Sequence, residues 1–452
     1  MKVQHHKVSL SMGLRSTWAR ARYMISSKAG QWKFRKRRFE VYALMAFILV
    51  GIFIISPSRS VKLADERQHP RLSIKLAEER QHPRQSLTPI NPPPSVLPII
   101  NHKVFRQVQA CLINSPDAPD DKPRLLHDPQ YTLPDDVEQH YREMLEITAS
   151  LRNIPLSTYA GWSGPWMENH FISEFCCDKP LSFFGGLVPL FIQWTDLWHL
   201  YKETWYDHVE GRNFISKLRK DVIYVALSQH DEGLYHIRQY FRPEDNWNIF
   251  VLSGGGFGHV ALPIFMRELQ FTPVNRDAPN HFVFAGNLVS YPVRHEMKRI
   301  LEETSVEPPY FSFRMYSGKH WKKVMRSGLL NLVPRGYGRS SFRLAEAVQM
   351  GCIPVYLWDD DDWSPYKGTE AHISNFGYSV KITEFKDFIK EITRNLRVDK
   401  NHLKIDEKLA KMRKVQDSHY TIPGLLQRLH YFFQGDPRSD LSCQRQPDTN
   451  VI

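Results

Sequence analysis

The apolar and polar positions of one stretch in the second half of the chain predict a strand, a loop, a helix and a second strand. Residues 329–333 are an apolar run of strand length, and the Pro- and Gly-rich residues 334–338 end it. Residues 341–350 carry apolar side chains at helical spacing, and Gly351 suits the left-handed residue that often ends a helix. Residues 352–358 are again a buried-strand pattern. This order is typical of a parallel α/β sheet.

The same alternation begins near Val104 and continues along the chain. Further strand-like runs are Leu187 to Trp194, Asp221 to Ser228, Trp247 to Ser253 and a run that begins at His281. Further helix-like segments are His259 to Leu269, Arg294 to Glu303, Lys400 to Gln416 and Ile422 to Phe433. Pro273 and Pro279 interrupt the pattern, so we expect a boundary between two α/β series near residues 271–280.

The net charge of the chain comes from its N-terminal segment. The sequence has 452 residues, 42% of them hydrophobic, which suits one or two globular domains, and a formal net charge of +12 at pH 7. Residues 1–38 hold eleven Lys or Arg and no Asp or Glu, so the remainder, with 49 basic and 48 acidic residues, is nearly neutral. Charge therefore gives no support for nucleic-acid binding by the folded region.

An apolar run follows this basic tail. Val41 to Ile55 contains fifteen uncharged residues, fewer than the roughly 17–25 of a membrane span, so flanking residues must contribute. We expect an uncleaved transmembrane signal anchor over residues 39–56. A cleaved signal peptide is the alternative, but the segment before the run is far longer than an ordinary n-region. The positive-inside rule places residues 1–38 in the cytosol and the rest in the lumen, which makes a single-pass type II protein of the Golgi membrane or the endoplasmic reticulum.

Residues 57–103 are predicted to be an extended stem. Lys62 to Arg71 and Lys75 to Arg84 are a tandem duplication, and a Pro-rich segment follows. Two copies are too few for a solenoid, so the segment is expected to hold the folded region away from the membrane. The two His-Pro pairs have no fixed geometry, and we expect no metal there.

The five cysteines all lie beyond the predicted anchor, in an oxidising compartment if this topology holds. Cys352 falls in a core strand and is expected to be free. The other four allow three pairings, and a bond between the neighbours Cys176 and Cys177 would be strained. We therefore expect two cross-links that involve Cys111 and Cys443.

The predicted loop before residue 341 has the features of an anion site. Ligands of parallel α/β sheets bind beyond the carboxyl ends of strands, where a helix N-terminus offers free N–H groups. Ser340 or Ser341 is expected to cap this helix. Arg335, Arg339 and Arg343 surround its start, and guanidinium groups suit phosphate oxygens, so a diphosphate is the expected ligand.

Glu346 lies one turn further along the same predicted helix. A carboxylate there does not favour phosphates, so its expected role is to accept hydrogen bonds from the ribose of a nucleotide. The alternative is a surface ion pair with Arg343 at i, i+3 spacing. The stretch lacks both the third Gly of a dinucleotide loop and the Lys-Ser/Thr of a P-loop, so a different nucleotide site is indicated.

The segment Pro334-Arg-Gly-Tyr-Gly-Arg-Ser-Ser-Phe-Arg-Leu-Ala-Glu-Ala-Val-Gln-Met-Gly-Cys-Ile-Pro-Val resembles the donor-site signature of the exostosin family of glycosyltransferases, glycosyltransferase family 47. Phe284-Ala-Gly-Asn and Val293-Arg-His-Glu-Met are similar to further segments of that family. The resemblance implies a GT-B fold, two Rossmann-like domains that face each other across a cleft. The expected domains are residues 104–275 on the acceptor side and residues 276–435 on the donor side, followed by a tail, residues 436–452.

The resemblance also implies a sugar-nucleotide donor, inversion at the anomeric carbon and no obligatory metal. Arg294 and Arg339, which fall in the similar segments, are expected to neutralise the departing diphosphate. Asp359 to Asp362 is a run of four carboxylates that could suggest a metal site. We expect these side chains to repel one another and to stay solvated.

Two loops could supply the catalytic base that inversion requires. One is the Gly-rich segment that ends in His259, and the other, Ser228 to Gly233, contains Asp231. Members of the family often carry Asp before the His of the first loop, and this chain has Gly258 there. His259 and Asp231 both remain candidates for the base.

The sequence therefore predicts an inverting glycosyltransferase that moves a sugar from a nucleotide-sugar, with UDP as the expected nucleotide, to a glycan or glycoprotein acceptor. The alternative is a lumenal accessory or binding protein that keeps the fold without turnover. A sulfotransferase would need a P-loop-like site that the sequence lacks.

Overall fold

The computed structural model of the chain describes residues 100–444, except residues 122, 160–161, 202–208, 236–240, 275–276, 290, 305–310 and 399–402. These described residues belong to one compact unit, Ile90–Ile452. The predicted basic tail (residues 1–38), the predicted anchor and nearly all of the predicted stem lie outside the described residues. Within the described part, no helix has both the length and the apolar character to cross a membrane.

The first sheet has four parallel strands in the order β1-β2-β3-β4. The strands are β1 (Val188–Leu190), β2 (Tyr224–Ser228), β3 (Ile249–Ser253) and β4 (Val260–Ala261). Every strand residue is buried, so both faces of the sheet are covered, as is usual for parallel sheets. The surrounding helices are α2 (His102–Ile113), α3 (Arg124–His127), α4 (Val137–Ile147), α5 (Met167–Phe175), α6 (Trp194–Tyr201) and α7 (Val209–Ser216), with short 3-10 helices at Ser150–Arg152, Leu181–Phe184 and Glu244–Asn246.

The second sheet has five parallel strands in the order β6-β5-β7-β8-β9. The strands are β5 (Asn280–Ala285), β6 (Phe313–Tyr316), β7 (Gly328–Pro334), β8 (Ile353–Trp358) and β9 (Tyr378–Lys381). The helices that follow them are α8 (Pro292–Glu303), α9 (Trp321–Met325), α10 (Phe342–Gln349), α11 (Ile373–Phe376), α12 (Phe385–Val398), α13 (Leu403–His419) and α14 (Ile422–Phe433), with 3-10 helices at Ile382–Glu384 and Pro437–Ser439.

The predicted α/β class is confirmed, and two parallel sheets are consistent with the GT-B architecture. The predicted order of strand, loop, helix and strand is present as β7, its loop, α10 and β8. Gly351 has a φ of 71°, and a Cβ there would stand 2.9 Å from the backbone of Pro273, so only Gly fits. The expected domain boundaries remain predictions.

The helix predicted over His259 to Leu269 is wrong. The His259 N–H bonds the carbonyl of Val251, and the Leu262 N–H bonds that of Ser253, so the chain forms β4 beside β3. Pro263 then lacks the N–H that a helix interior needs. This proline was a sequence signal against a helix.

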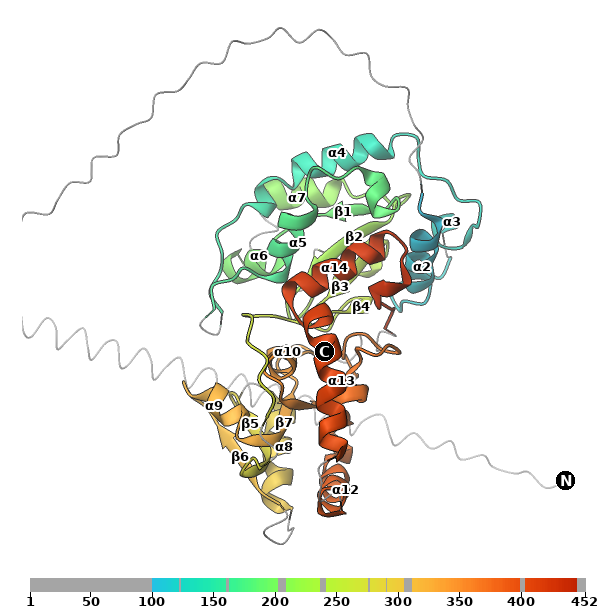
Figure 1. Cartoon of the computed structure of the whole chain (residues 1–452). Coiled ribbons are helices and arrows are strands. Elements are labelled where there is room, and N and C mark those ends of the chain that lie inside the picture. Colours follow the sequence, from blue (N-terminus) through green and yellow to red (C-terminus); the bar gives the residue numbers. More distant parts are fainter. Residues whose placement is uncertain are drawn as a thin grey trace, which may run out of the picture. The chain divides into compact units, whose positions relative to one another are not determined.

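Helix α14 returns to the first sheet (Figure 1). Phe432 stacks on Phe250 of β3, with ring centroids 5.9 Å apart. Phe433 lies between Phe175 of α5 and Phe184, at 5.7 and 5.1 Å. This aromatic contact joins the C-terminal end of the chain to the core of the first sheet.

The expected cystine pairing differs from the pairing in the structure. Cys111 on α2 is bonded to Cys443, across 332 residues of sequence, and Cys176 is bonded to its neighbour Cys177. The prediction rejected the bond between neighbours, but Cys177 adopts a φ of 92°, a conformation that sequence alone does not reveal. Cys352 is free and buried, as predicted.

Candidate functional site

A cavity of about 270 Å³ lies beyond the carboxyl ends of strands from both sheets. The loops after β2, β5 and β7 reach it, together with the first residues of α8 and α10. Its lining residues are Tyr159, Asp231, Ile264, Met266, Phe284, Gly286, Asn287, Arg294, Gly336, Tyr337, Ser340, Ser341, Phe342 and Arg343. Parallel α/β sheets bind ligands at this end of their strands.

The Gly-rich loop after β3 packs directly on the loop after β7. The Arg339 N–H donates to the Gly255 carbonyl at 2.9 Å, and the Ser340 hydroxyl donates to the Gly254 carbonyl. A Cβ on Gly256, whose φ is 115°, would stand only 2.3 Å from Cβ of Arg339. These glycines therefore permit a close contact between two loops, one from each sheet.

Arg335 and Arg339 do not line this cavity, and their expected contact with the donor remains a prediction. Arg335 is 3% exposed and pairs with Asp359 at 2.8 Å and Asp360 at 2.5 Å. Arg339, 5% exposed, pairs with Asp360 at 2.9 Å and donates to the Gly256 carbonyl at 3.0 Å. Both guanidinium groups take part in ion pairs that stabilise the loop after β7.

The side chains of Asp359 to Asp362 stay partly exposed, as expected, but they also bind neighbouring groups. Asp360 joins both buried arginines, and Asp362 accepts hydrogen bonds from Ser364 and Ser379. The arginines lower the pKa of Asp360 against the effect of its burial. Across the described residues, no group of three or more His, Cys, Asp or Glu side chains could hold a metal ion.

Arg294, at the start of α8, does line the cavity. Its Nε donates to the Arg335 carbonyl at 3.1 Å, and its Nη1 donates to the Asn287 carbonyl at 2.7 Å. Its Nη2 lies 3.4 Å from the point where a Cβ on Gly336 would stand, so the Gly leaves space before the guanidinium. Two backbone carbonyls thus fix a cation whose remaining donors can face an anion.

Arg343, in the first turn of α10, is the second basic residue of the cavity. Its Nε donates to the Ala285 carbonyl at 2.7 Å, and its guanidinium lies over the ring of Trp321 at 4.2 Å. Burial, Arg294 and Arg267 lower its pKa to about 10, so the side chain stays charged at neutral pH. Arg294 and Arg267 are thus close enough to Arg343 to affect it, and the carboxylate of Glu346 offsets part of this positive charge.

Glu346 does not line the cavity. It is 3% exposed and accepts a hydrogen bond from the Nη1 of Arg343. The pair at i, i+3 spacing therefore exists, but Glu346 is buried, so it is not the surface pair considered as the alternative. Its expected contact with a ribose remains a prediction.

Ser341 is the N-cap of α10, with a β-region backbone, as predicted for one of the two serines. Its side chain makes no capping hydrogen bond, and both Ser340 and Ser341 line the cavity. The first N–H groups of an eight-residue helix thus begin at the cavity, where they favour an anion.

Asp231 lies in the cavity on the side of the first sheet. Burial and the neighbouring Glu232 raise the pKa of Asp231 to about 6, although the Gly338 N–H, Arg335 and Arg294 favour its ionised form. A carboxylate with a pKa near neutrality can accept a proton and release it at physiological pH.

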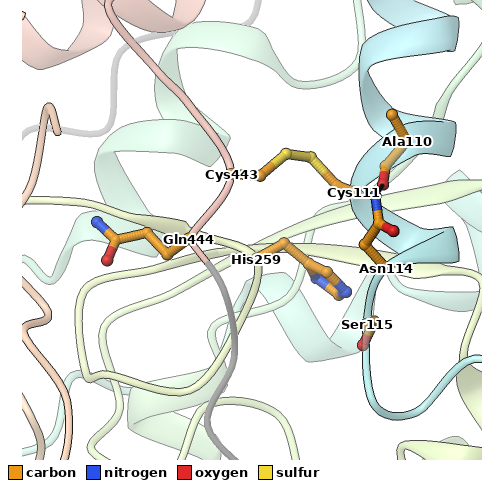
Figure 2. A pocket seen from close by; sticks show the side chains of 7 residues that line it. All are labelled: Ala110, Cys111, Asn114, Ser115, His259, Cys443 and Gln444. Carbon is orange, nitrogen blue, oxygen red and sulfur yellow. Dashed lines mark hydrogen bonds between the residues drawn. A yellow bond between two sulfur atoms is a disulfide. The ribbon is translucent and has the colours of Figure 1, made fainter. Parts of the chain in front are cut away.

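His259 faces a different cavity of about 390 Å³, beside the Cys111–Cys443 disulfide (Figure 2). Its Nδ1 accepts a hydrogen bond from the Val251 N–H at 3.0 Å, and its ring stacks on Phe250. Burial lowers the pKa of His259 to about 4. The structure does not bring His259 and Arg294 to one site, so of the two candidate bases only Asp231 lies with the arginines.

Several residues that line the cavity were not predicted as site residues from the sequence. Tyr159 comes from an irregular segment before α5, and Asn287 from the loop after β5. Tyr337 stands between the glycines of the predicted loop and could have been noticed there. The others depend on contacts between segments far apart in the chain.

Two comparisons with known proteins found similar ones. Residues 237–396 match the model of the exostosin GT47 domain, a glycosyltransferase domain. Among solved structures, the chain is similar to the crystal structure of TarM, with 11% sequence identity and a TM-score of 0.30. That similarity covers 47% of this chain and 51% of the TarM chain, so the chain spans about half the length of that relative.

Proposed function

We propose that the protein is an inverting glycosyltransferase that moves a sugar from a UDP-sugar to a glycan or glycoprotein acceptor. The GT47 domain implies sugar transfer. The observation that carries the finer proposal is the distribution of charge in the cavity, where Arg294, Arg343 and the start of α10 lie with the carboxylate of Asp231.

The basic wall of the cavity suits the diphosphate of the donor. Arg294 and Arg343 each use part of their guanidinium to bond backbone carbonyls, which holds them in place before a ligand arrives. Fixed donors of this kind stabilise charge that develops on a leaving group, because they need little reorganisation during the reaction. These cations can supply the charge that a metal would otherwise provide, and we propose no obligatory metal or other cofactor.

Asp231 is the proposed general base. In the proposed reaction, the acceptor hydroxyl gives its proton to the Asp231 carboxylate while its oxygen bonds to the anomeric carbon. The bond to the diphosphate breaks on the opposite face, and UDP leaves with both electrons. The configuration at the anomeric carbon is thereby inverted.

The proposed location is the Golgi membrane, with residues beyond about 57 in the lumen. The basic segment 1–38 before the apolar run and the bonds Cys111–Cys443 and Cys176–Cys177 support this proposal. Protease protection of the C-terminus in intact microsomes tests it. Digestion of the C-terminus with protection of the N-terminus would contradict it.

Turnover is tested with the full-length protein purified in detergent. The measurement is release of nucleoside diphosphate from a panel of UDP- and GDP-linked sugars, with and without mixed glycan acceptors. We expect release from a UDP-sugar by the wild type and loss of release in Asp231→Asn. UDP binding without release from any donor would instead support the accessory-protein alternative.

A further inference from the structure

Two exposed aromatic side chains line the cavity. The described residues include six large apolar side chains that are exposed: Leu156, Tyr159, Leu200, Val289, Tyr337 and Val398. Two of these, Tyr159 at 42% and Tyr337 at 59% exposure, line the cavity itself. Exposed large apolar groups that cluster beside a cavity point to a ligand.

The ring of Tyr159 is supported from behind. It stacks on His199, with centroids 5.1 Å apart and an angle of 21° between the planes. His199 lies 6.1 Å from the ring of Trp166, whose Nε1 donates to Asp196 at 2.8 Å. Tyr159 also exchanges two backbone hydrogen bonds of 2.9 Å with Trp162. These contacts hold an exposed aromatic face in one position.

Tyr337 follows β7 of the second sheet, and a residue in the loop after β2 of the first sheet holds its side chain. Its hydroxyl donates to Glu232 at 3.0 Å, across 105 residues of sequence. Glu232, burial and Asp231 raise the pKa of Tyr337, and burial and Asp231 raise that of Tyr159 although Arg294 lowers it. Both phenol groups are therefore close enough to the Asp231 carboxylate to be influenced by its charge.

The acidic and the basic side chains of the cavity come from different elements. The two basic residues that line the cavity, Arg294 and Arg343, belong to α8 and α10 of the second sheet. Beside Tyr159 and Tyr337 lie the carboxylates of Asp231 and Glu232. These two carboxylates disfavour an acidic ligand and accept hydrogen bonds from hydroxyl groups, while Arg294 offsets part of their charge.

We propose that Tyr159 and Tyr337 form the acceptor subsite, which binds the C–H face of an uncharged saccharide and directs one of its hydroxyl groups to Asp231. The inference rests on the proposed function, because it assigns the second substrate of the same reaction. Sugar rings combine an apolar C–H face with polar edges, and tyrosine offers a rigid, amphipathic surface for them at a low cost in conformational entropy.

The test is saturation-transfer NMR with the full-length protein in detergent at a saturating concentration of UDP. The neutral probes are cellotetraose, xylotetraose and β1,4-galactotetraose, and the acidic probe is tetragalacturonic acid. We expect transfer to the C–H protons of at least one neutral probe and a weaker effect for the acidic probe. In Tyr159→Ala and Tyr337→Ala the dissociation constant of that neutral probe should rise at least fivefold.

The control variants separate the role of the ring from other effects. Tyr159→Phe keeps the ring and should bind within about twofold of the wild type. Tyr337→Phe keeps the ring but loses the bond to Glu232, so its affinity should lie between those of the wild type and Tyr337→Ala. Val398→Ala, an exposed residue at the end of α12 that does not line the cavity, should have no effect. Melting temperatures identify any alanine variant that fails to fold. In that case Tyr159→Leu and Tyr337→Leu replace it, and loss of probe binding in both is the decisive result.

UDP titration distinguishes this proposal from the proposed function. If UDP binds and none of the neutral probes does, or if the acidic probe binds more tightly, the acceptor subsite is overturned and the donor site stands. Unchanged affinity in the alanine variants also overturns the subsite. If UDP itself does not bind, the proposed function fails together with it.

Discussion

Asp360→Asn tests the assignment of Arg335 and Arg339 to structure instead of donor binding. The carboxylate of Asp360 pairs with Arg335 at 2.5 Å and with Arg339 at 2.9 Å, and these arginine side chains are 3% and 7% exposed. Removal of one partner from a buried ion pair costs about 3–5 kcal/mol. Asp360 is itself 32% exposed, and Arg335 keeps Asp359, so we expect a loss of about 2–3 kcal/mol.

The assay is thermal unfolding at several pH values, with Asp361→Asn as the matched control. A loss of this size lowers the melting temperature of a unit of this length by about 3–4 °C. The pKa of folded Asp360 is lowered, so its stabilisation is present above the pKa of the unfolded state, about 4, and is lost as pH falls through the folded pKa. The pKa of Asp361 is raised by burial, so its replacement should be neutral or stabilising at pH 7. Equal melting temperatures for Asp360→Asn and wild type would refute the structural assignment.

Three further predictions concern single substitutions. Asp231→Asn should reduce kcat by about 10²–10⁴-fold, and wild-type kcat should rise with pH through about 6 as Asp231 loses its proton; a flat pH profile would remove Asp231 as the base. His259→Asn keeps an acceptor for the Val251 N–H, so it should retain kcat and its pH profile, and loss of turnover in a folded variant would restore His259 as a candidate. Cys443→Ser opens the bond to Cys111 and should cost about 2–5 kcal/mol in the free energy of unfolding, measured by denaturant titration; an unchanged midpoint would contradict this.

The fold could be predicted where local patterns and tertiary structure agree. The stretch that contains β7, α10 and β8 has its apolar runs, its Gly-rich loop and Gly351 in the positions that the structure requires. The segment from His259 to Leu269 was wrongly predicted from its periodicity, because Val260 and Ala261 pair with β3, although Pro263 was a signal against a helix. A periodic pattern alone did not reveal that pairing.

The candidate site was predicted only in part, and the reason is electrostatic. The sequence shows that Arg335, Arg339 and Arg343 surround a loop, but the partner of a guanidinium depends on segments far away in the chain. Asp360, 25 residues after Arg335, forms ion pairs with Arg335 and Arg339, and both arginines are buried. Arg343 remains at the cavity, where Arg294 joins it from another helix.

The central claim, that the cavity binds the diphosphate of a nucleotide-sugar through Arg294, is tested most directly by calorimetric titration of UDP into three full-length proteins. Wild type should bind UDP, and Arg294→Lys, which keeps the charge but loses the planar group, should bind about tenfold more weakly with a melting temperature close to wild type. Arg339→Lys should lower the melting temperature, because it disturbs the buried pair with Asp360. Absence of UDP binding by the wild type, or equal affinity in Arg294→Lys, would contradict the account.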